Sequence, residues 1–326
     1  MQAFEYASPA TLKEATALLG ATWADAQVLA GGTDLISSMK EYLETPKRVV
    51  NIKGIKDLGG IRKSGSTMRI GALATFDEIA NSAAIRSEYP SIHEAVRGVS
   101  SPQIRNMGTA GGDLCQRPRC WYFRTGNGLL GMKDGKSLVE NGQNQYHAIF
   151  GGGPARFVSA SSLGPALVAL GAKVKLVSAS GSRDVPVEEF FIVPKTEEER
   201  ETALKPGEIL TEILIPSANG GKNATYEIRE KEALDWPLVA ASVVLGMKGS
   251  SIGSARVVLG HVAPKPWVSA EAAQFLNGKT ITEEVAEQAG AAAVKSAQPL
   301  SENEYKVQLA KVAVKRALLT AAGKQV

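Results

Sequence analysis

Two short segments of related sequence limit the fold of this chain more than any other feature. Ala30-Gly31-Gly32-Thr33-Asp34-Leu35 follows an apolar run at 26–30 and leads into a helical pattern at 35–42. Ala110-Gly111-Gly112-Asp113-Leu114 repeats the order Ala-Gly-Gly, a short polar element and Leu. Two adjacent glycines let a backbone turn tightly and bring consecutive N–H groups against an anion. The sequence therefore predicts two sharp turns, each in its own α/β unit.

Together the two turns could hold a diphosphate from both sides. A helix that begins just after a turn adds the positive end of its dipole, which favours a negative ligand. The hydroxyls of Thr33 and Thr109 could donate further hydrogen bonds. The alternative is that each segment only connects a strand to a helix. A related pair in two α/β settings favours a dinucleotide ligand over that alternative.

The chain divides into three expected parts. Its 326 residues are enough for two or three packed units. We expect an N-terminal lobe at 1–57, a second lobe at 58–217 with an insertion at about 115–153, and a C-terminal domain at 218–326. The insertion is rich in glycine and polar residues, and long irregular stretches in compact domains are usually functional or added segments. The predicted fold class is α+β: two α/β lobes followed by a C-terminal domain of antiparallel sheet and helices.

Periodicity and turn signals place the individual elements. Strands are predicted at 26–30, 49–52, 68–73, 173–178, 209–215, 238–247 and 255–260. Helices are predicted at 10–19, 35–42, 76–83, 91–99 and 163–170, with three alanine-rich helices in the last third. Two of these last helices are expected to begin at capping boxes, Thr280-Ile281-Thr282-Glu283 and Ser301-Glu302-Asn303-Glu304.

Composition argues against several classes of protein. Hydrophobic residues make up 44% and charged residues 21%, which is typical of a globular chain. A net charge of +4 without basic runs argues against nucleic acid as a partner. The sequence predicts no signal peptide and no membrane span. Cys115 and Cys120 are too few for a disulfide scaffold and indicate a reducing compartment. We therefore expect a cytoplasmic chain, which a partner with an export signal could still carry across a membrane.

The paired glycine segments also carry a resemblance to a known family. Residues 30–35 resemble the first FAD loop, and residues 104–113 the second, of the flavoprotein subunits of the xanthine dehydrogenase and carbon monoxide dehydrogenase family, the molybdenum hydroxylases. Other segments follow the family's order: Ile70-Gly71-Ala72-Leu73-Ala74-Thr75, Pro165-Ala166-Leu167, Gly207-Glu208-Ile209-Leu210, Tyr305-Lys306-Val307 and Arg316-Ala317-Leu318. The resemblance spans essentially the whole chain, is strongest to the aldehyde-oxidoreductase-like branch with a cysteine-containing insertion, and implies the PCMH-type FAD-binding fold.

The resemblance implies FAD as the cofactor and assigns residues to it. Those implied for the diphosphate and ribityl chain are Leu29, Ala30, Gly31, Gly32, Thr33, Asp34, Leu35, Thr109, Gly111, Gly112 and Asp113. Glu208 and Lys231 are implied to lie near the flavin, where a cation would stabilise the anionic reduced ring. The alternative for Lys231 is a surface lysine. Ser162 stands where relatives often carry Asp, so it could only donate a hydrogen bond there, and Asp113 stands where they usually carry Asn.

The start of the insertion resembles a segment that holds a [4Fe–4S] cluster in some relatives. Such a cluster needs about four thiolates, whereas Cys115 and Cys120 are the only cysteines. We therefore expect packed thiols and no metal site. The histidines, His93, His147 and His261, do not have metal-ligand spacing and are expected to be satisfied core or surface residues. Trp236 is expected to be a buried core residue, although a position near the flavin ring is the alternative.

The resemblance implies that this chain is the FAD-binding electron-transfer subunit of an oxidoreductase heterotrimer. The implied partners are a molybdopterin-binding large subunit, which oxidises the substrate, and a [2Fe–2S] small subunit, which relays electrons to the flavin. The flavin would then pass them to NAD or another acceptor. No catalytic residue is assigned, so the chain alone should be inactive on the reducing substrate. Two alternatives stay open: a stand-alone FAD-dependent oxidoreductase, and a scaffold subunit that has lost its flavin.

Overall fold

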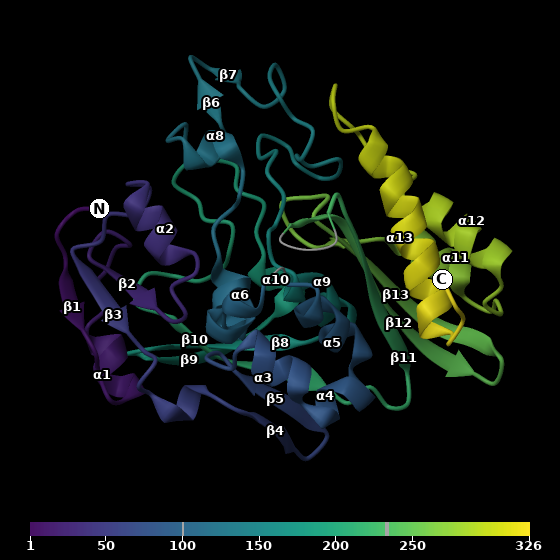
Figure 1. Cartoon of the computed structure of the whole chain (residues 1–326), viewed down its shortest axis with the longest axis horizontal. Helices are drawn as coiled ribbons and strands as arrows, with labels where there is room; N and C mark the ends of the chain where they lie inside the picture. The colour runs from purple at the N-terminus through teal and green to yellow at the C-terminus, as the bar shows by residue number, and fades with distance from the viewer. Residues whose placement is uncertain (100, 232–234) are drawn as a thin grey trace.

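In the described residues, three β-sheets of three to five strands follow one another from the N-terminal to the C-terminal side of the molecule (Figure 1). The computed structural model describes residues 1–99, 101–231 and 235–326. Helices pack on the sheets and between them, and each sheet contributes to a hydrophobic core of its own. The predicted α+β class with two N-terminal lobes and a C-terminal sheet-and-helix part is confirmed.

The N-terminal sheet is parallel and has the order β1-β3-β2. Its elements are β1 (Glu5–Ala7), α1 (Leu12–Ala17), β2 (Ala26–Leu29), α2 (Leu35–Lys40) and β3 (Arg48–Asn51). Parallel pairing requires crossover helices, and α1 and α2 supply them. The first glycine segment follows β2 directly, so it lies at the carboxyl end of a parallel strand, where open α/β sheets bind their ligands.

The second sheet has the order β4-β5-β10-β8-β9, and all its neighbouring strands are antiparallel. Its strands are β4 (Ile61–Ser64), β5 (Thr67–Gly71), β8 (Lys173–Ser178), β9 (Gly181–Pro186) and β10 (Ile209–Pro216). The surrounding helices are η1 (Lys56–Leu58), α3 (Phe76–Asn81), α4 (Ala83–Glu88), α5 (Pro90–Arg97), α9 (Leu163–Ala169) and α10 (Val187–Phe190). The predicted helix at 76–83 ends early because Ser82 begins α4, its hydroxyl accepting a hydrogen bond from the Ile85 amide at 3.4 Å.

A helical segment and the insertion join the two halves of this second lobe. They contain α6 (Pro102–Met107), α7 (Ala110–Cys115), α8 (Trp121–Arg124) and a small hairpin of β6 (Met132–Lys133) and β7 (Lys136–Ser137). The second glycine segment therefore follows helix α6, so the alternative that it only connects a strand to a helix does not apply to it. Ser101 and Pro102 start α6 as cap and first residue. The insertion rises from the body of the molecule, with the hairpin at its tip (Figure 1).

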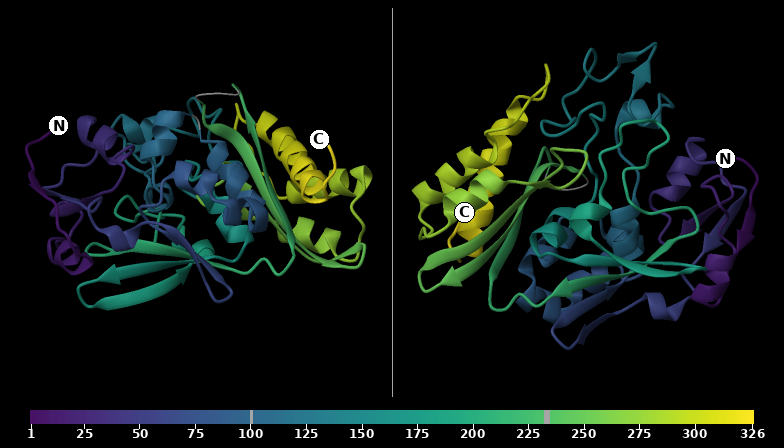
Figure 2. Two further views of the ribbon diagram at one scale, coloured as in Figure 1. Left: turned by 60° about the horizontal axis from the view of Figure 1, so that its bottom comes forward. Right: turned by 180° about the vertical axis from the view of Figure 1, so that it is seen from behind.

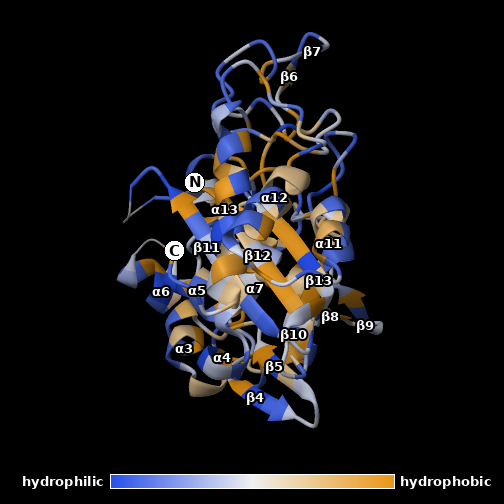
Figure 3. Cartoon of the chain, turned by 90° about the vertical axis from the view of Figure 1, so that its right-hand side faces the viewer, coloured by the Kyte–Doolittle hydropathy of each residue, from blue (hydrophilic) through white to orange (hydrophobic). Residues whose placement is uncertain are grey.

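The C-terminal sheet is antiparallel, in the order β11-β12-β13-β14. Its elements are β11 (Lys222–Arg229), β12 (Pro237–Lys248), β13 (Ser251–Gly260), β14 (Trp267–Val268), α11 (Ala270–Leu276), α12 (Glu283–Ala293) and α13 (Tyr305–Ala321). Helices α11–α13 cover the outer face of the sheet (Figure 2), and its long strands β12 and β13 are largely apolar (Figure 3). Helices α5 and α9 contact the sheet too, and join it to the second lobe.

Both predicted capping boxes in this part are wrong. The cap of α12 is Thr282, whose hydroxyl accepts a hydrogen bond from the Val285 amide at 3.1 Å. Helix α13 begins at Tyr305 without a side-chain cap, because Ser301 and Glu302 bond to Asn144 of the insertion instead. The predicted domain boundaries stay predictions. Within the described ranges, no helix is long and apolar enough to cross a membrane.

Candidate functional site: a cleft between two glycine segments

The first glycine segment is in direct contact with Met107 and Gly108, which come just before the second segment in the chain. A Cβ atom on Gly31 would lie 1.8 Å from the carbonyl oxygen of Met107, the last residue of α6. That distance is impossible for a side chain, so only glycine allows the first turn to approach the end of α6 this closely. Gly32 has a φ of +75°, the left-handed conformation in which glycine has no Cβ penalty. Gly31 is therefore required by a close contact, and Gly32 is required by its backbone conformation.

The backbone amides of the two segments are used in different ways. In the described part of the chain, no acceptor is bonded to the N–H groups of Gly31, Gly32, Thr33 or Asp34. In the second segment the Gly111 N–H donates to the Ala72 carbonyl at 2.9 Å, and the Gly112 N–H donates to the Thr109 hydroxyl oxygen at 3.2 Å. The first turn therefore presents open donors. The second presents a capping hydroxyl, whose own proton is available to a ligand.

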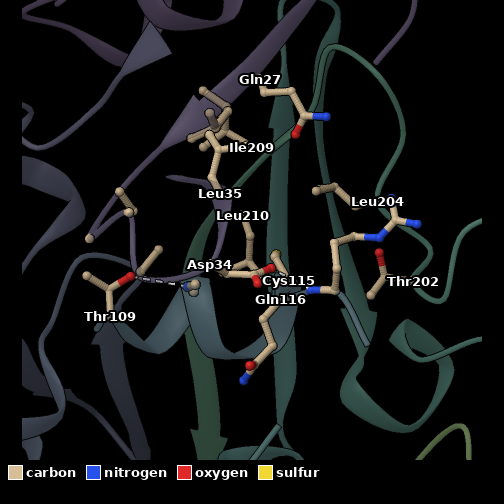
Figure 4. Close-up of a pocket in the computed structure, with 18 of the residues that line it drawn as sticks. Gln27, Asp34, Leu35, Thr109, Cys115, Gln116, Thr202, Leu204, Ile209 and Leu210 are labelled. Carbon is tan, nitrogen blue, oxygen red and sulfur yellow. Dashed lines mark hydrogen bonds between the residues drawn. The ribbon is translucent and has the colours of Figure 1, made fainter. Parts of the chain in front are cut away.

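Both segments line one cavity of about 160 Å³, which we call the glycine cavity. In the view of Figure 4, Thr109 lies on one side of this cavity, Thr202 and Leu204 lie on the other side, and Asp34, Leu35 and Leu210 lie between them. The predicted residues that line it are Ala30, Gly31, Gly32, Thr33, Asp34, Leu35, Thr109, Gly111, Gly112 and Glu208. The expected shared cleft is therefore present.

Asp34 binds the insertion through three arginines. Its carboxylate accepts hydrogen bonds from the Arg117 backbone amide at 2.8 Å and from the Arg124 guanidinium at 2.8 Å, and Arg119 lies 3.1 Å away. These groups are largely buried. Because its oxygens already have partners, Asp34 positions the first turn and the insertion relative to each other and does not present a free acceptor to a ligand.

A second layer of buried charge lies behind Asp34. Arg117 bridges the carboxylates of Glu44 and Glu201 at 2.7 and 2.8 Å, and Arg200 reaches Glu44 at 3.0 Å. Burial raises the pKa of both Glu44 and Glu201, an effect that Arg117 opposes. Sequence reasoning missed this network. The only signal for it was the repeated arginine at 117, 119 and 124 in an otherwise irregular segment.

Asp113 and Ser162 meet beside the second segment. The buried carboxylate of Asp113 accepts hydrogen bonds from the Ser161 hydroxyl at 2.5 Å, the Ser162 amide at 3.2 Å and the Leu163 amide at 3.0 Å. Burial raises the pKa of Asp113 to about 6, against these hydrogen bonds, which lower it. Asp113 thus accepts hydrogen bonds from the otherwise unpaired backbone amides at the N-terminus of α9. The sequence did not reveal this structural role.

Two further cavities continue the cleft towards the C-terminal domain. The Trp236 cavity, about 200 Å³, shares Thr33, Thr109 and Gly112 with the glycine cavity and reaches Val99 and Trp236. The histidine cavity, about 220 Å³, shares Trp236 with the second and reaches the insertion. The three cavities therefore adjoin one another in the order glycine cavity, Trp236 cavity, histidine cavity. The first lies at the glycine segments and the last lies at the C-terminal sheet.

Trp236 is 45% exposed, so the prediction of a buried core residue is wrong. The guanidinium of Arg119 lies over its ring, 4.9 Å from the centroid, in a cation–π contact. This side chain therefore presents an aromatic face to the two cavities that it separates.

The two residues expected near the flavin lie apart. Glu208 lines the glycine cavity and forms a two-point ion pair with Arg183 at 2.7 and 2.8 Å. Partial burial opposes ionisation of Glu208, but the hydrogen bonds from Arg183 and the Lys205 amide outweigh it and lower its pKa. Lys231 is exposed beyond the end of β11 and lines none of the three described cavities. Leu29 is half-buried at the end of β2.

The cysteines and two of the histidines lie on the cavity walls. Both cysteines are free thiols. Cys115 lines the glycine cavity, and burial raises its pKa to about 12. Cys120 lies 3.1 Å from the Nε2 atom of His147 in the histidine cavity, which also includes His261. Among the described residues, no group of three or more His, Cys, Asp and Glu side chains is placed to hold a metal ion.

Comparisons with known proteins agree along the whole chain. The family model for the FAD-binding domain in molybdopterin dehydrogenase matches residues 2–218, and the model for the CO dehydrogenase flavoprotein C-terminal domain matches residues 224–321. The chain is 30% identical to the carbon monoxide dehydrogenase medium chain of Hydrogenophaga pseudoflava, over 97% of this chain and 96% of that one. It is 31% identical to the aldehyde oxidoreductase FAD-binding subunit PaoB of Escherichia coli (strain K12), over 95% and 96%.

Solved structures give the same result. The chain is similar to one in the cyanide-inactivated Cu,Mo-CO dehydrogenase, with a TM-score of 0.77 and 29% identity over 99% of this chain and 98% of that one. It is also similar to a chain of quinoline 2-oxidoreductase from Pseudomonas putida 86, with a TM-score of 0.78 and 25% identity over 99% and 98%.

Proposed function

Since this chain belongs to the family of FAD-binding subunits of molybdenum hydroxylases, we propose that it receives electrons from a [2Fe–2S] small subunit and passes them to NAD or another external acceptor. A molybdopterin-binding large subunit oxidises the substrate in this proposal. The bound FAD supplies the redox chemistry, and the chain supplies binding, orientation and electrostatics. The oxidoreductase activity belongs to the assembled complex. One observation carries the proposal: the two glycine segments line a single cavity, and the first of them touches Met107 and Gly108 just before the second.

The residues around that cleft fit a diphosphate. The open N–H groups of Gly31, Gly32 and Thr33 are consecutive donors around a left-handed glycine, an arrangement that binds anions. The Thr109 hydroxyl, which already accepts from the Gly112 amide, has its proton free to donate to a phosphate oxygen. Lys53, whose Nζ donates to the Ala30 carbonyl at 3.1 Å, adds a positive charge next to the turn. We assign the diphosphate to this place.

The two ends of the cofactor would then occupy the two neighbouring cavities. The Trp236 cavity has Val99 and Trp236 on its wall, and apolar and aromatic walls suit a planar ring system. We place the flavin ring there, with Asp113 and Ser162 beside the ribityl chain, and the adenosine in the glycine cavity near Leu29, Leu35 and Glu208. For Lys231 we keep the proposal that it lies near the flavin ring, and we give it no part in binding the diphosphate or the adenosine.

Anaerobic reduction of the purified complex tests this function. We expect flavin absorbance in an amount equal to this chain, bleaching when the substrate of the large subunit is added, and recovery when an acceptor is supplied. The separately purified chain should keep its flavin but should not be bleached by that substrate. A colourless chain would support a scaffold role instead. Turnover by the chain alone would support a stand-alone oxidoreductase.

A further inference from the structure

The histidine cavity is built by the insertion and the C-terminal domain. The insertion supplies Cys120, Trp121 and His147, and the C-terminal domain supplies Trp236 and His261. Trp121 packs edge-on against the ring of His147, 5.4 Å between centroids. The result is a cavity of about 220 Å³ with several aromatic walls, next to the Trp236 cavity and distinct from the glycine cavity.

His261 is the unusual residue in this wall. It is 3% exposed, and in the described part of the chain its Nε2 atom has no hydrogen-bond partner, as is also true of the Nδ1 atom of His147 in the same wall. Buried polar side chains nearly always have such a partner. It also has a φ of +60°, a conformation that costs a residue with a Cβ free energy and is concentrated at functional sites. Burial lowers the pKa of His261 to about 3, so its ring is neutral at pH 7.

Lys306 of α13 holds the cavity in shape. Its Nζ donates hydrogen bonds to the carbonyl oxygens of Tyr146 and His147 at 3.2 Å each and of His261 at 2.6 Å. The side chain is buried, and burial lowers its pKa to about 7. Because one ammonium group ties the insertion to the end of β13, the cavity wall is fixed before any ligand enters. A preformed site loses less entropy on binding than a mobile one.

The lining indicates the chemistry of a ligand. An apolar cavity of about 150 Å³ accommodates benzene in another protein, so this one has room for a compound of one or two rings. Neutral imidazoles can donate or accept one hydrogen bond each, which suits a carbonyl or hydroxyl group. Two acidic residues, Glu230 and Asp235, and two basic residues, Arg119 and Lys306, are also part of the lining. Because neither sign of charge is in excess, the lining favours an uncharged ligand.

We propose that the histidine cavity binds a small, uncharged, planar ring compound that carries a carbonyl or hydroxyl group, with the ring of His261 as its hydrogen-bond partner. The site lies beside the cavity to which we assign the flavin ring and shares Trp236 with it. It does not require the flavin to be present.

Equilibrium dialysis of the purified, flavin-containing complex tests this proposal with two probes. Duroquinone offers carbonyl groups and 1-naphthol offers a hydroxyl, so the pair also shows which group is preferred. We expect saturable binding of at least one probe with a dissociation constant in the micromolar range. The variant His261→Asn keeps a side chain that tolerates a positive φ but removes the imidazole, and Val158→Phe fills the cavity from its wall. Both should weaken binding by about tenfold or more.

His93→Asn is the matched control, because His93 is another buried histidine, in α5 and away from this cavity. It should bind the probe as the unchanged chain does. The proposal is overturned if neither probe binds saturably, if both cavity variants bind like the control, or if NAD displaces the probe. Flavin absorbance is recorded on the same samples. Flavin without probe binding defeats this inference alone, whereas a sample without flavin defeats the proposed function.

Discussion

The two glycine segments have nearly the same sequence but differ in backbone conformation and in hydrogen bonding. In the first, Gly32 is left-handed and the amides from Gly31 to Asp34 have no acceptor among the described residues. In the second, Gly111 and Gly112 lie inside the first turn of α7, and their amides are bonded within the chain. A pair of glycines therefore indicates that a Cβ atom would collide with a neighbouring group or strain the backbone. It does not indicate whether the backbone comes close to a ligand or packs as part of a helix.

The difference has a steric origin. Gly31 must lack a Cβ because the Met107 carbonyl occupies that place, whereas a Cβ on Gly111 would meet the Cβ of Ala72 at 2.8 Å. The first contact joins a turn to the end of α6. The second packs α7 against the residue that follows β5. We infer that the first segment supplies the donors to the diphosphate and that the second supplies the Thr109 hydroxyl and a rigid support.

The largest effect should follow from Asp34→Asn. This change removes the charge that pairs with the guanidinium groups of Arg119 and Arg124, and breaking a buried ion pair from one side costs about 3–5 kcal/mol. Urea denaturation should show a loss of this size in the free energy of unfolding. Asp134→Asn, in the exposed hairpin turn, is the control. Equal stability of the two variants would show that the arginine cluster does not hold the first turn.

Gly31→Ala should separate the two segments. The new Cβ would require the Met107 carbonyl to move, and overpacking of this kind costs about 1–3 kcal/mol. We expect a lower melting temperature and a purified chain with much less flavin. Gly54→Ala is the matched control, because a Cβ there meets no atom within 4 Å. A Gly31→Ala chain that keeps its full flavin content would contradict the role of this contact.

Stability should depend on the protonation of Asp113. Its pKa is about 6 in the folded chain and 3.8 as the reference value. The folded chain therefore binds this proton more tightly than the unfolded chain does. Protonation of Asp113 stabilises the folded chain as pH falls through about 6, and this stabilisation is lost as pH rises through the same range. Between pH 7 and pH 5 the unchanged chain should gain about 1 kcal/mol relative to Asp113→Asn. Denaturation curves at both pH values measure this difference. A constant difference would mean that the carboxyl group is not the source.

Thr109→Ala should affect stability and cofactor together. Loss of an N-cap hydroxyl costs about 1 kcal/mol, and the same hydroxyl is our proposed donor to the diphosphate. FAD should dissociate more readily in a titration followed by flavin fluorescence. Thr109→Ser restores the hydroxyl and should restore both properties. If the serine variant releases FAD like the alanine variant, the hydroxyl is not a ligand.

Gly112→Ala should have the smallest effect. Alanine favours a helix by about 1 kcal/mol over glycine, and this gain offsets the crowding of a Cβ 2.9 Å from the Thr109 hydroxyl oxygen. Stability should change by less than about 1 kcal/mol, and the flavin should stay bound. A loss of flavin like that of Gly31→Ala would mean that the two segments serve the ligand in the same way.

The sequence was sufficient for the architecture because repetitive patterns determine it. Alternating apolar residues predicted β8 and β10, and the helical pattern after the first turn predicted α2. The cleft shared by the glycine segments was also predicted, since two such turns that hold one ligand must face the same space. The individual partners were not, because they depend on distant segments. Asp34 bonds to residues 83 and 90 positions away. Ser301 was predicted to cap a helix, but its hydroxyl accepts a hydrogen bond from Asn144 instead.

The histidines show the same limit in another form. His147 and His261 are 114 positions apart and have no metal-ligand spacing, so they were predicted to be satisfied residues. The fold brings them to one cavity because Lys306 ties both backbones to α13. Spacing along a chain detects only sites made by one element, whereas this cavity is made by an insertion, a strand end and a helix.

A crystal structure of the flavin-loaded complex tests the central claim most directly. We predict that the diphosphate lies between the two segments, with its oxygens bonded to the amides of Gly31 and Gly32 and to the hydroxyl of Thr109, and that the flavin ring lies against Trp236. A diphosphate bound away from the contact between Gly31 and Met107, with the first-turn amides still unbonded, would contradict it.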